Sequence, residues 1–341
     1  MPAIRVHPEV EHALKHGSPV VALETAVLTH GLPRIARKAP AALADLLGPD
    51  HGWKPTEPAN LELSRALARA VRKGGATPAT IGVLDGELVI GLGDDELTRL
   101  GSDGRAVKSS ERDLAPLLAS GGSAGTTVAA TVAACSLASP AIRVFATGGI
   151  GGVHRGWTER PDISADLDAI ARHRVCVVSA GAKSILDLPA TLEALDTLGV
   201  PALGFGTPRF PRFLTRGDAS MPVREVPASP AEVARILDLH WSAPPRGLGR
   251  SQGVLLCVDP PEEHALPLDE IEPIIAAEVE AARARGLSAD RVTPALLAAI
   301  ASRSGGRSVE ANVAALVSNA LVAASVAVAH ARLLHAGHPS A

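Results

Sequence analysis

The chain has 341 residues, enough for one large α/β domain or two modest ones. Aromatic residues make up 2% of it, with no tyrosine, and the net charge is −3, so nucleic-acid binding is disfavoured. The three cysteines are far apart and the N-terminus lacks a signal-peptide core. We therefore expect a cytoplasmic protein without disulfides or a zinc site.

Short apolar runs that suit strands covered on both faces recur along the chain, at 20–23, 80–84, 88–92, 142–147, 175–179, 202–205 and 254–258. Helical patterns lie between many of these runs, at 61–73, 126–137, 185–198, 230–239, 268–285, 294–302 and 309–334. Because strands and helices alternate, the sequence predicts an α/β fold with a mostly parallel central sheet flanked by helices.

Two stretches rich in turn-forming residues predict surface additions to this fold. They are an insertion at 34–57 and a loop at 241–253. A third stretch, 311–329, is almost entirely apolar and about as long as a membrane span. It is rich in alanine and carries asparagine and serine, so we interpret it as a buried helix and expect no membrane partner.

Lys183 is the clearest candidate for a chemical role. It follows the predicted strand 175–179 in a frame of small residues, Ala-Gly-Ala-Lys-Ser, and it is the last of only six lysines. A desolvated lysine, unlike arginine, can lose its proton and attack a carbonyl carbon. The alternative is a surface lysine at the start of a helix.

Glu24 leaves the predicted strand 20–23 in the same way. A carboxyl group buried at such a position has a raised pKa and can act as an acid near neutral pH. Pairing with a core arginine is an equally good interpretation of Glu24 by itself.

Two glycine-rich segments could bind an anion. Segment 121–127 opens a predicted helix whose free N–H groups suit a phosphate, and Thr127 can either donate to that phosphate or cap the helix. Segment 148–156 follows a predicted strand and contains His154 and Arg155, which can also hold an anion. A tight structural turn is the alternative for 148–156.

Asp162 and Asp166 are four residues apart. On one helix they would share a face and call for a cation or a substrate's donors between them, although Asp162 could instead cap the helix that follows. An acid, a phosphate cradle, a hard-cation site and an amine together suit covalent chemistry on a phosphorylated sugar.

These residues closely resemble the pseudouridine-5′-phosphate glycosidase (indigoidine synthase A-like) family over about residues 20–329. The segments that carry the resemblance are 21–24, 30–33, 75–80, 145–156, 162–167 and 180–184. The resemblance implies a single α/β/α domain over residues 1–341, a homotrimer, and reversible cleavage of the C–C glycosidic bond of pseudouridine 5′-phosphate to uracil and ribose 5-phosphate. Segment 34–57 departs from the family's pattern and could reshape the base pocket.

Carried over by position, the resemblance also implies roles for single residues. Lys183 would be the nucleophile that forms a Schiff base with C1′ of the opened ribose, Glu24 the proton donor, and Asp162 the ligand of one Mn²⁺ per subunit, held largely through water. The substrate contacts that the resemblance implies are Lys108 (on the phosphate), Val128, Ser164, Ala165, Asp166 and Asn312. The two glycine-rich segments add Thr127 and His154 as candidate substrate contacts.

Two alternative functions stay open. One is a family member that acts on a different base or in indigoidine-type pigment biosynthesis. The other is a non-catalytic phosphosugar-binding protein, which predicts a loss among the nucleophile, the acid and the metal ligand, yet Lys183, Glu24 and Asp162 are all present.

Overall fold

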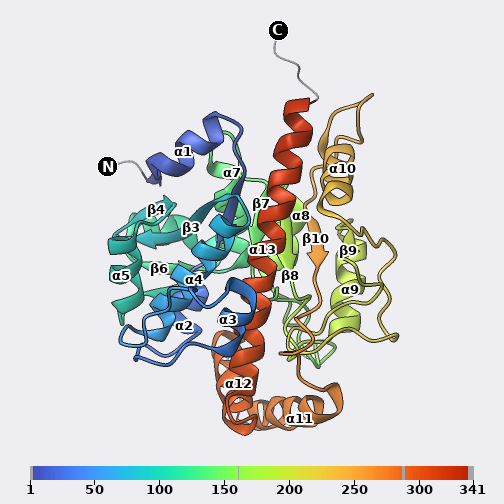
Figure 1. The fold of residues 1–341 in the computed structure, drawn as a ribbon. Coiled ribbons are helices and arrows are strands. Elements are labelled where there is room, and N and C mark those ends of the chain that lie inside the picture. Colours follow the sequence, from blue (N-terminus) through green and yellow to red (C-terminus); the bar gives the residue numbers. More distant parts are fainter. Residues whose placement is uncertain (1–2, 160, 286–288, 337–341) are drawn as a thin grey trace.

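Ten strands form one mixed sheet in the computed structural model, which describes residues 3–159, 161–285 and 289–336 (Figure 1). The main path runs β1-β4-β3-β2-β7-β8-β10-β9, and off this path β6 pairs with β3 and β5 pairs with β6. The strands are β1 Ile4–Val6, β2 Val20–Leu23, β3 Thr77–Leu84, β4 Glu87–Ile90, β5 Val107–Ser109, β6 Ala124–Thr126, β7 Val144–Ala146, β8 Cys176–Ser179, β9 Ala202–Gly204 and β10 Val254–Cys257.

The middle of the sheet, from β3 to β9, is parallel throughout. Among the strand pairings that the structure describes, those of β3 with β4 and with β6 are antiparallel. The expectation of a mostly parallel, mixed sheet in a single α/β domain is confirmed.

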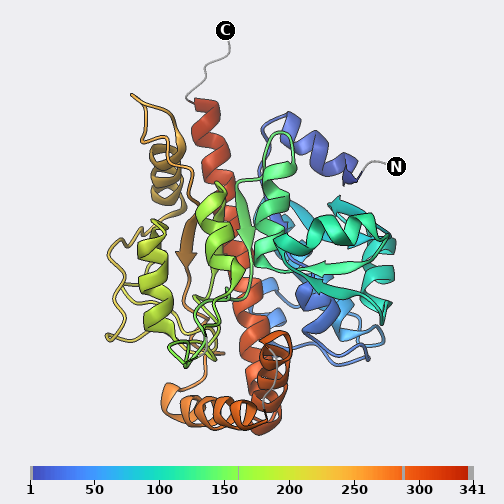
Figure 2. The same ribbon diagram turned by 180° about the vertical axis from the view of Figure 1, so that it is seen from behind.

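Helices cover both faces of the sheet (Figures 1 and 2). One face carries α3 Ala41–Leu47, α4 Ala59–Lys73, α10 Pro230–Trp241 and α13 Arg307–Ala336, and the other carries α1 Pro8–Lys15, α7 Val128–Leu137, α8 Ala165–Arg172 and α9 Leu188–Thr197. The remaining helices are α2 Ala26–His30, α5 Asp94–Ser102, the 3₁₀ turn η1 Glu111–Asp113, α6 Leu114–Ala119, α11 Leu268–Ala284 and α12 Ala289–Arg303.

Successive side chains of one strand point to opposite faces of the sheet. In β7, Val144 and Ala146 pack toward α4 and α13, whereas Phe145 packs toward α7 and α8. In β8, Val178 likewise packs toward α4 and α13, whereas Val177 packs toward α7 and α8. Burial on both faces explains why these strands read as uninterrupted apolar runs in the sequence.

Helix α13 is the apolar segment that we expected to be buried. Among the described residues it alone is long and apolar enough to cross a membrane, but 67% of its most apolar window is buried inside the fold. It lies along the sheet and packs against α4, α10 and β7 (Figure 1). Its alanines let the helix lie close to the strands, so α13 is a core helix of this domain.

The two ends of segment 34–57 lie next to each other. The N–H of Ala59 donates to the carbonyl of Ile35 (2.9 Å). Between these ends, α3 packs against α13, and Leu43 and Trp53 are buried. The loop after α10 is also closed, because Trp241 Nε1 donates to the carbonyl of Gln252 (2.8 Å).

Three strands, β1, β5 and β6, were not predicted. Each has only three residues and lies outside the parallel core, and β5 and β6 are rich in small or polar residues (Val-Lys-Ser and Ala-Gly-Thr). Segment 121–127, expected to be a glycine-rich loop that opens a helix, instead contains β6, because Ala124–Thr126 pairs with β3 and β5, and α7 begins only at Val128.

Candidate active site

Three neighbouring parallel strands end at one edge of the sheet. Leu23 of β2, Ala146 of β7 and Val178 of β8 lie at the same level of the ladder. The polar side chains that follow these strands therefore meet at this edge, as is common in parallel α/β sheets. Glu24 follows β2 directly, and Lys183 follows β8.

Lys183 is half-buried against the glycine-rich segment that follows β7. Its backbone N–H donates to the carbonyl of Ile150 (3.0 Å), and its Nζ donates to the carbonyl of Gly149 (2.9 Å). The alternative of a lysine at a helix start is wrong, because α9 begins only at Leu188. The amine is instead held by two backbone contacts to the neighbouring loop.

Glu24 points toward the same loop. Thr147 Oγ1 donates a short hydrogen bond to Glu24 Oε1. Burial raises the pKa of Glu24, while the positive charge of Lys183 and the Thr147 hydrogen bond act in the opposite direction. Among the described residues no arginine forms an ion pair with Glu24, so the interpretation of a core Glu–Arg pair is wrong.

Asp166 connects the glycine-rich segment to helix α7. Its Oδ1 accepts from the N–H of Ala129 (2.9 Å) and its Oδ2 from the N–H of Gly151 (2.8 Å). A Cβ at Gly151 would lie 2.3 Å from Ser164 Oγ and 2.8 Å from Asp166 Oδ2, so glycine is needed there. Asp166 is thus a buried positioning residue as well as a neighbour of Glu24, whose pKa its charge raises.

Replacing Asp166 by alanine is expected to lower the free energy of unfolding by about 2–4 kcal/mol, because it leaves two backbone N–H groups without an acceptor. The control is Asp168→Ala on the same helix, where an exposed pair with Arg172 is lost. That change should cost less than about 1 kcal/mol. Urea unfolding of both variants checks this, and equal losses would contradict the positioning role.

Asp162 lies before α8 rather than on it. The cap of α8 is Ser164, whose Oγ accepts from the N–H of Asp166 (3.2 Å), so Asp162 neither caps the helix nor shares a face with Asp166. Its half-exposed carboxylate lies 3.9 Å from His154 Nδ1. Burial lowers the pKa of His154, although Asp162 opposes the shift.

The described residues contain no cluster of three His, Cys, Asp or Glu side chains that could hold a metal. Asp162, with the imidazole of His154 beside it, fits a cation that keeps most of its water, as Mg²⁺ often does. It does not fit a closed protein cage.

The start of α7 has an unused hydroxyl. Thr127 is the N-cap residue, but its side chain makes no capping hydrogen bond, and its Oγ1 is buried without a partner in the described structure. The alternative of a helix-capping side chain is therefore wrong. Val128 packs its side chain into the core, so it can offer a ligand only its backbone.

Lys108 on β5 adds a cation to this region. Desolvation and the charge of Lys183 lower the pKa of Lys108, whereas Asp166 and Glu24 raise it, so all four side chains lie within electrostatic reach. Burial is the main cause that lowers the pKa of His30, and the charge of Lys108 lowers it further.

Asn312 and Ala165 complete the predicted set. Asn312 Oδ1 lies 3.0 Å from the position that a Cβ on Gly148 would take, so it borders the glycine-rich segment. Ala165 is the exposed first residue of α8. The structure thus brings the predicted residues around two loops, those that follow β7 and β8.

Three residues at this edge were missed or misassigned. Thr147 contacts Glu24, and Asn319 of α13 donates to the carbonyl of Thr147 (2.7 Å). Arg155, expected to bind an anion, donates to the carbonyls of Ser184 (2.9 Å) and Leu186 (3.2 Å) and pairs with Glu272. Arg155 therefore supports the Lys183 loop.

A family model for indigoidine synthase A like proteins matches residues 50–329. The chain belongs to the indigoidine synthase A like family. Relatives named pseudouridine-5′-phosphate glycosidase include those of Deinococcus radiodurans (45% identity; 96% of this chain and 95% of the relative) and Myxococcus xanthus (43%; 96% and 99%). The family resemblance predicted from the sequence is confirmed.

Solved structures of the family agree with the fold. The prealnumycin C-glycosynthase AlnA, in complex with ribulose 5-phosphate, superposes with a TM-score of 0.81 at 34% identity over 98% of both chains. An indigoidine synthase A-like protein from Thermotoga maritima gives 0.77 at 33% identity over 95% of both chains.

Proposed function

We propose that this chain is a pseudouridine-5′-phosphate glycosidase, which reversibly cleaves the C–C bond between ribose C1′ and uracil C5. The observation that carries the proposal is that a primary amine, Lys183, and a carboxyl, Glu24, whose pKa burial raises, lie within electrostatic reach after the ends of β8 and β2, the two strands on either side of β7. The names of the full-length relatives support the same substrate.

The residue types fit the difficulty of the reaction. A carbon leaving group departs poorly, so an O-glycosidase route with water attack alone would not suffice. In the proposed route, neutral Nζ of Lys183 attacks C1′ as the C1′–O4′ bond breaks, and the proton that the nitrogen then loses balances the one that O4′ gains. The resulting secondary amine again carries an electron pair, which can expel the base.

Glu24 supplies the proton for the leaving carbon. As the C1′–C5 bond breaks, Glu24 protonates C5, and the nitrogen electron pair completes a Schiff base at C1′. Water then hydrolyses the Schiff base, which regenerates the amine and releases ribose 5-phosphate. No step consumes another high-energy compound, so the same residues can join uracil to the sugar phosphate.

Groups around this pair suit the rest of the substrate. Lys108 supplies a positive charge for the phosphate, and the start of α7 with the unpartnered Thr127 hydroxyl supplies hydrogen-bond donors. His154, Asn312 and the 164–166 turn border the same glycine-rich segment, where the opened ribose chain would lie.

We also propose that Asp162 binds one hydrated Mn²⁺ per subunit, which would supply positive charge to the substrate's oxygen atoms. Asp162→Asn is expected to weaken Mn²⁺ binding by about 10–100-fold, measured by the electron paramagnetic resonance signal of free Mn²⁺. Asp168→Asn, on the exposed side of α8, is the control. An unchanged titration for Asp162→Asn would remove the metal from this position.

A homotrimer and a cytoplasmic location remain part of the proposal. The three cysteines are free and buried, which supports a reducing compartment. Light scattering of the purified protein tests the oligomeric state, and a monomer would contradict it.

A second candidate is a family member that forms or breaks a C-glycosidic bond to a different base. The fold similarity to a C-glycosynthase favours it. The deciding experiment mixes the protein with Mn²⁺ and pseudouridine 5′-phosphate and follows uracil release, with uridine 5′-phosphate as the control. Uracil from the first substrate alone supports the proposal, and no uracil from either favours the second candidate.

A further inference from the structure

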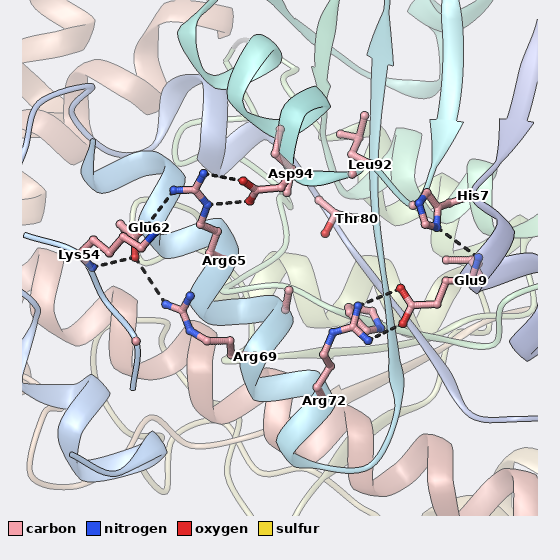
Figure 3. A pocket seen from close by; sticks show the side chains of 17 residues that line it. His7, Glu9, Lys54, Glu62, Arg65, Arg69, Arg72, Thr80, Leu92 and Asp94 are labelled. Atoms are coloured by element: carbon pink, nitrogen blue, oxygen red, sulfur yellow. Dashed lines mark hydrogen bonds and ion pairs between the residues drawn. The ribbon is translucent and has the colours of Figure 1, made fainter. Parts of the chain in front are cut away.

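A cleft of about 540 Å³ lies beside helix α4 (Figure 3). Its walls come from α4, the ends of β3 and β4, the start of α1, and the 34–57 segment, which contributes Gly52 and Lys54. None of the residues of the candidate active site lines it. Its volume is in the range of small-molecule sites, about 300–1,000 Å³.

Arg65, Arg69 and Arg72 follow one another along the side of α4 that faces the cleft (Figure 3). Two of them are matched by carboxylates. Arg65 donates to Asp94 from Nε (2.7 Å) and from Nη2 (2.8 Å). Arg72 donates from Nη1 and Nη2 to the two carboxylate oxygens of Glu9. Such bidentate pairs satisfy the planar fork of a guanidinium.

Arg69, between them, makes a longer ion pair, with Glu62 (Figure 3). Its Nε and Nη2 are buried and have no hydrogen-bond partner in the described structure. The nearest carboxylate, Glu62, lies 3.6 Å away, and its oxygens already accept from Arg65 Nη1 (2.9 Å) and from the N–H of Lys54 (3.0 Å). Burial lowers the pKa of Arg69, yet a guanidinium keeps its proton. A buried charged donor without an acceptor is costly.

The chain also approaches Arg69 closely. Gly52 has φ +73°, and a Cβ built on it would lie 3.4 Å from Arg69 Nε. The cleft is lined by four basic side chains, Lys54, Arg65, Arg69 and Arg72, against three acidic ones, Glu9, Glu62 and Asp94, with His7 beside Glu9. The lining therefore has one more basic than acidic side chain, and its guanidinium donors without a hydrogen bond are Nε and Nη2 of Arg69.

From these observations we infer that the cleft beside α4 binds a small phosphate-bearing anion, with the fork of Arg69 as its main ligand and Lys54 and Arg72 beside it. Two parallel N–H groups of one guanidinium match two phosphate oxygens. The cleft has more room than a phosphate fills, so a phosphomonoester fits as well as the inorganic ion. The bound anion would connect the 34–57 segment to α4.

Calorimetric titration with inorganic phosphate in chloride buffer tests this site. The intact protein should show a binding step that Arg69→Met removes, and that Arg69→Lys, which keeps the charge but loses the fork, weakens by about tenfold. Arg99→Met, which removes an exposed arginine paired with Asp85 outside the cleft, should leave the titration unchanged. Phosphate bound at the candidate active site persists in all variants and is removed separately by Lys108→Met.

Gly52→Asp provides a second test that keeps every basic residue. Aspartate tolerates positive φ better than most residues, and its carboxylate would occupy the place of the anion beside Arg69. It should abolish the same binding step if Arg69→Met does not fold. Titrating AMP in parallel distinguishes the source of the anion: tighter binding of AMP assigns a phosphomonoester, and equal binding assigns inorganic phosphate. Identical titrations for the intact protein, Arg69→Met and Gly52→Asp would overturn the inference.

Discussion

Replacing Lys183 by alanine is expected to reduce uracil release from pseudouridine 5′-phosphate by about 10⁴-fold or more, the scale seen when a covalent nucleophile is removed. The fold should survive. Only the hydrogen bond from Nζ to Gly149 is lost, and this costs about 1 kcal/mol. Steady-state kinetics and urea unfolding together check both expectations.

Two further variants make this result specific. Lys183→Arg keeps a positive charge beside Glu24 and Lys108 but cannot become a neutral nucleophile, so it should be as inactive as the alanine variant. Lys15→Ala removes an exposed lysine paired with Glu11 and should retain full activity. Substantial turnover by Lys183→Arg would show that charge rather than nucleophilicity is needed.

Replacing Glu24 by glutamine is expected to lower turnover by about 10²–10⁴-fold, because the amide cannot donate the proton to C5. In the intact enzyme kcat/KM should fall as the pH rises through the raised pKa of Glu24, since the acid must be protonated. Thr147→Val removes the hydrogen bond that lowers this pKa, so the fall should move to higher pH.

The same group predicts a change in stability. The folded-state pKa of Glu24 lies above its value in the unfolded chain, so its contribution to stability is complete below the unfolded pKa and is lost as the pH rises through the folded pKa. Glutamine does not titrate, so the Glu24→Gln variant does not lose stability in this way as the pH rises. Its stability relative to the intact protein should therefore increase with pH across that window. A pH-independent difference in urea unfolding would contradict the assigned pKa direction.

The sequence predicted the parts of the site that depend on single strands. The strands before Glu24 and Lys183 are buried on both faces, so their apolar runs were visible within a residue of their true ends. The three-residue strands β5 and β6 were not visible, because they are stabilised by pairing, of β6 with β3 and of β5 with β6, rather than by a local pattern.

Contacts between distant segments were beyond local patterns. Asn319 reaches the carbonyl of Thr147 across 172 residues of chain, and only the packing of α13 on β7 brings them together. Arg155 carried an anion-binding signal in the sequence, but the position of α11 commits it to Glu272. Asp162 was a candidate helix cap in the sequence, but the N-cap residue of α8 is Ser164.

The 34–57 segment shows the same limit. Its turn-forming residues predicted an insertion, but they did not reveal that α3 packs on α13 or that Gly52 and Lys54 line the arginine cleft. These roles follow from where the two ends meet, between Ile35 and Ala59.

In the proposed mechanism the Lys183 amine bonds covalently to C1′ of the sugar phosphate. Incubating the protein with ribose 5-phosphate and borohydride and mapping the product by mass spectrometry tests this bond. We expect the peptide carrying Lys183 to gain the mass of one reduced pentose phosphate, and the Lys183→Arg variant to gain none. An unmodified Lys183 peptide from active enzyme, or modification at another lysine, would contradict it.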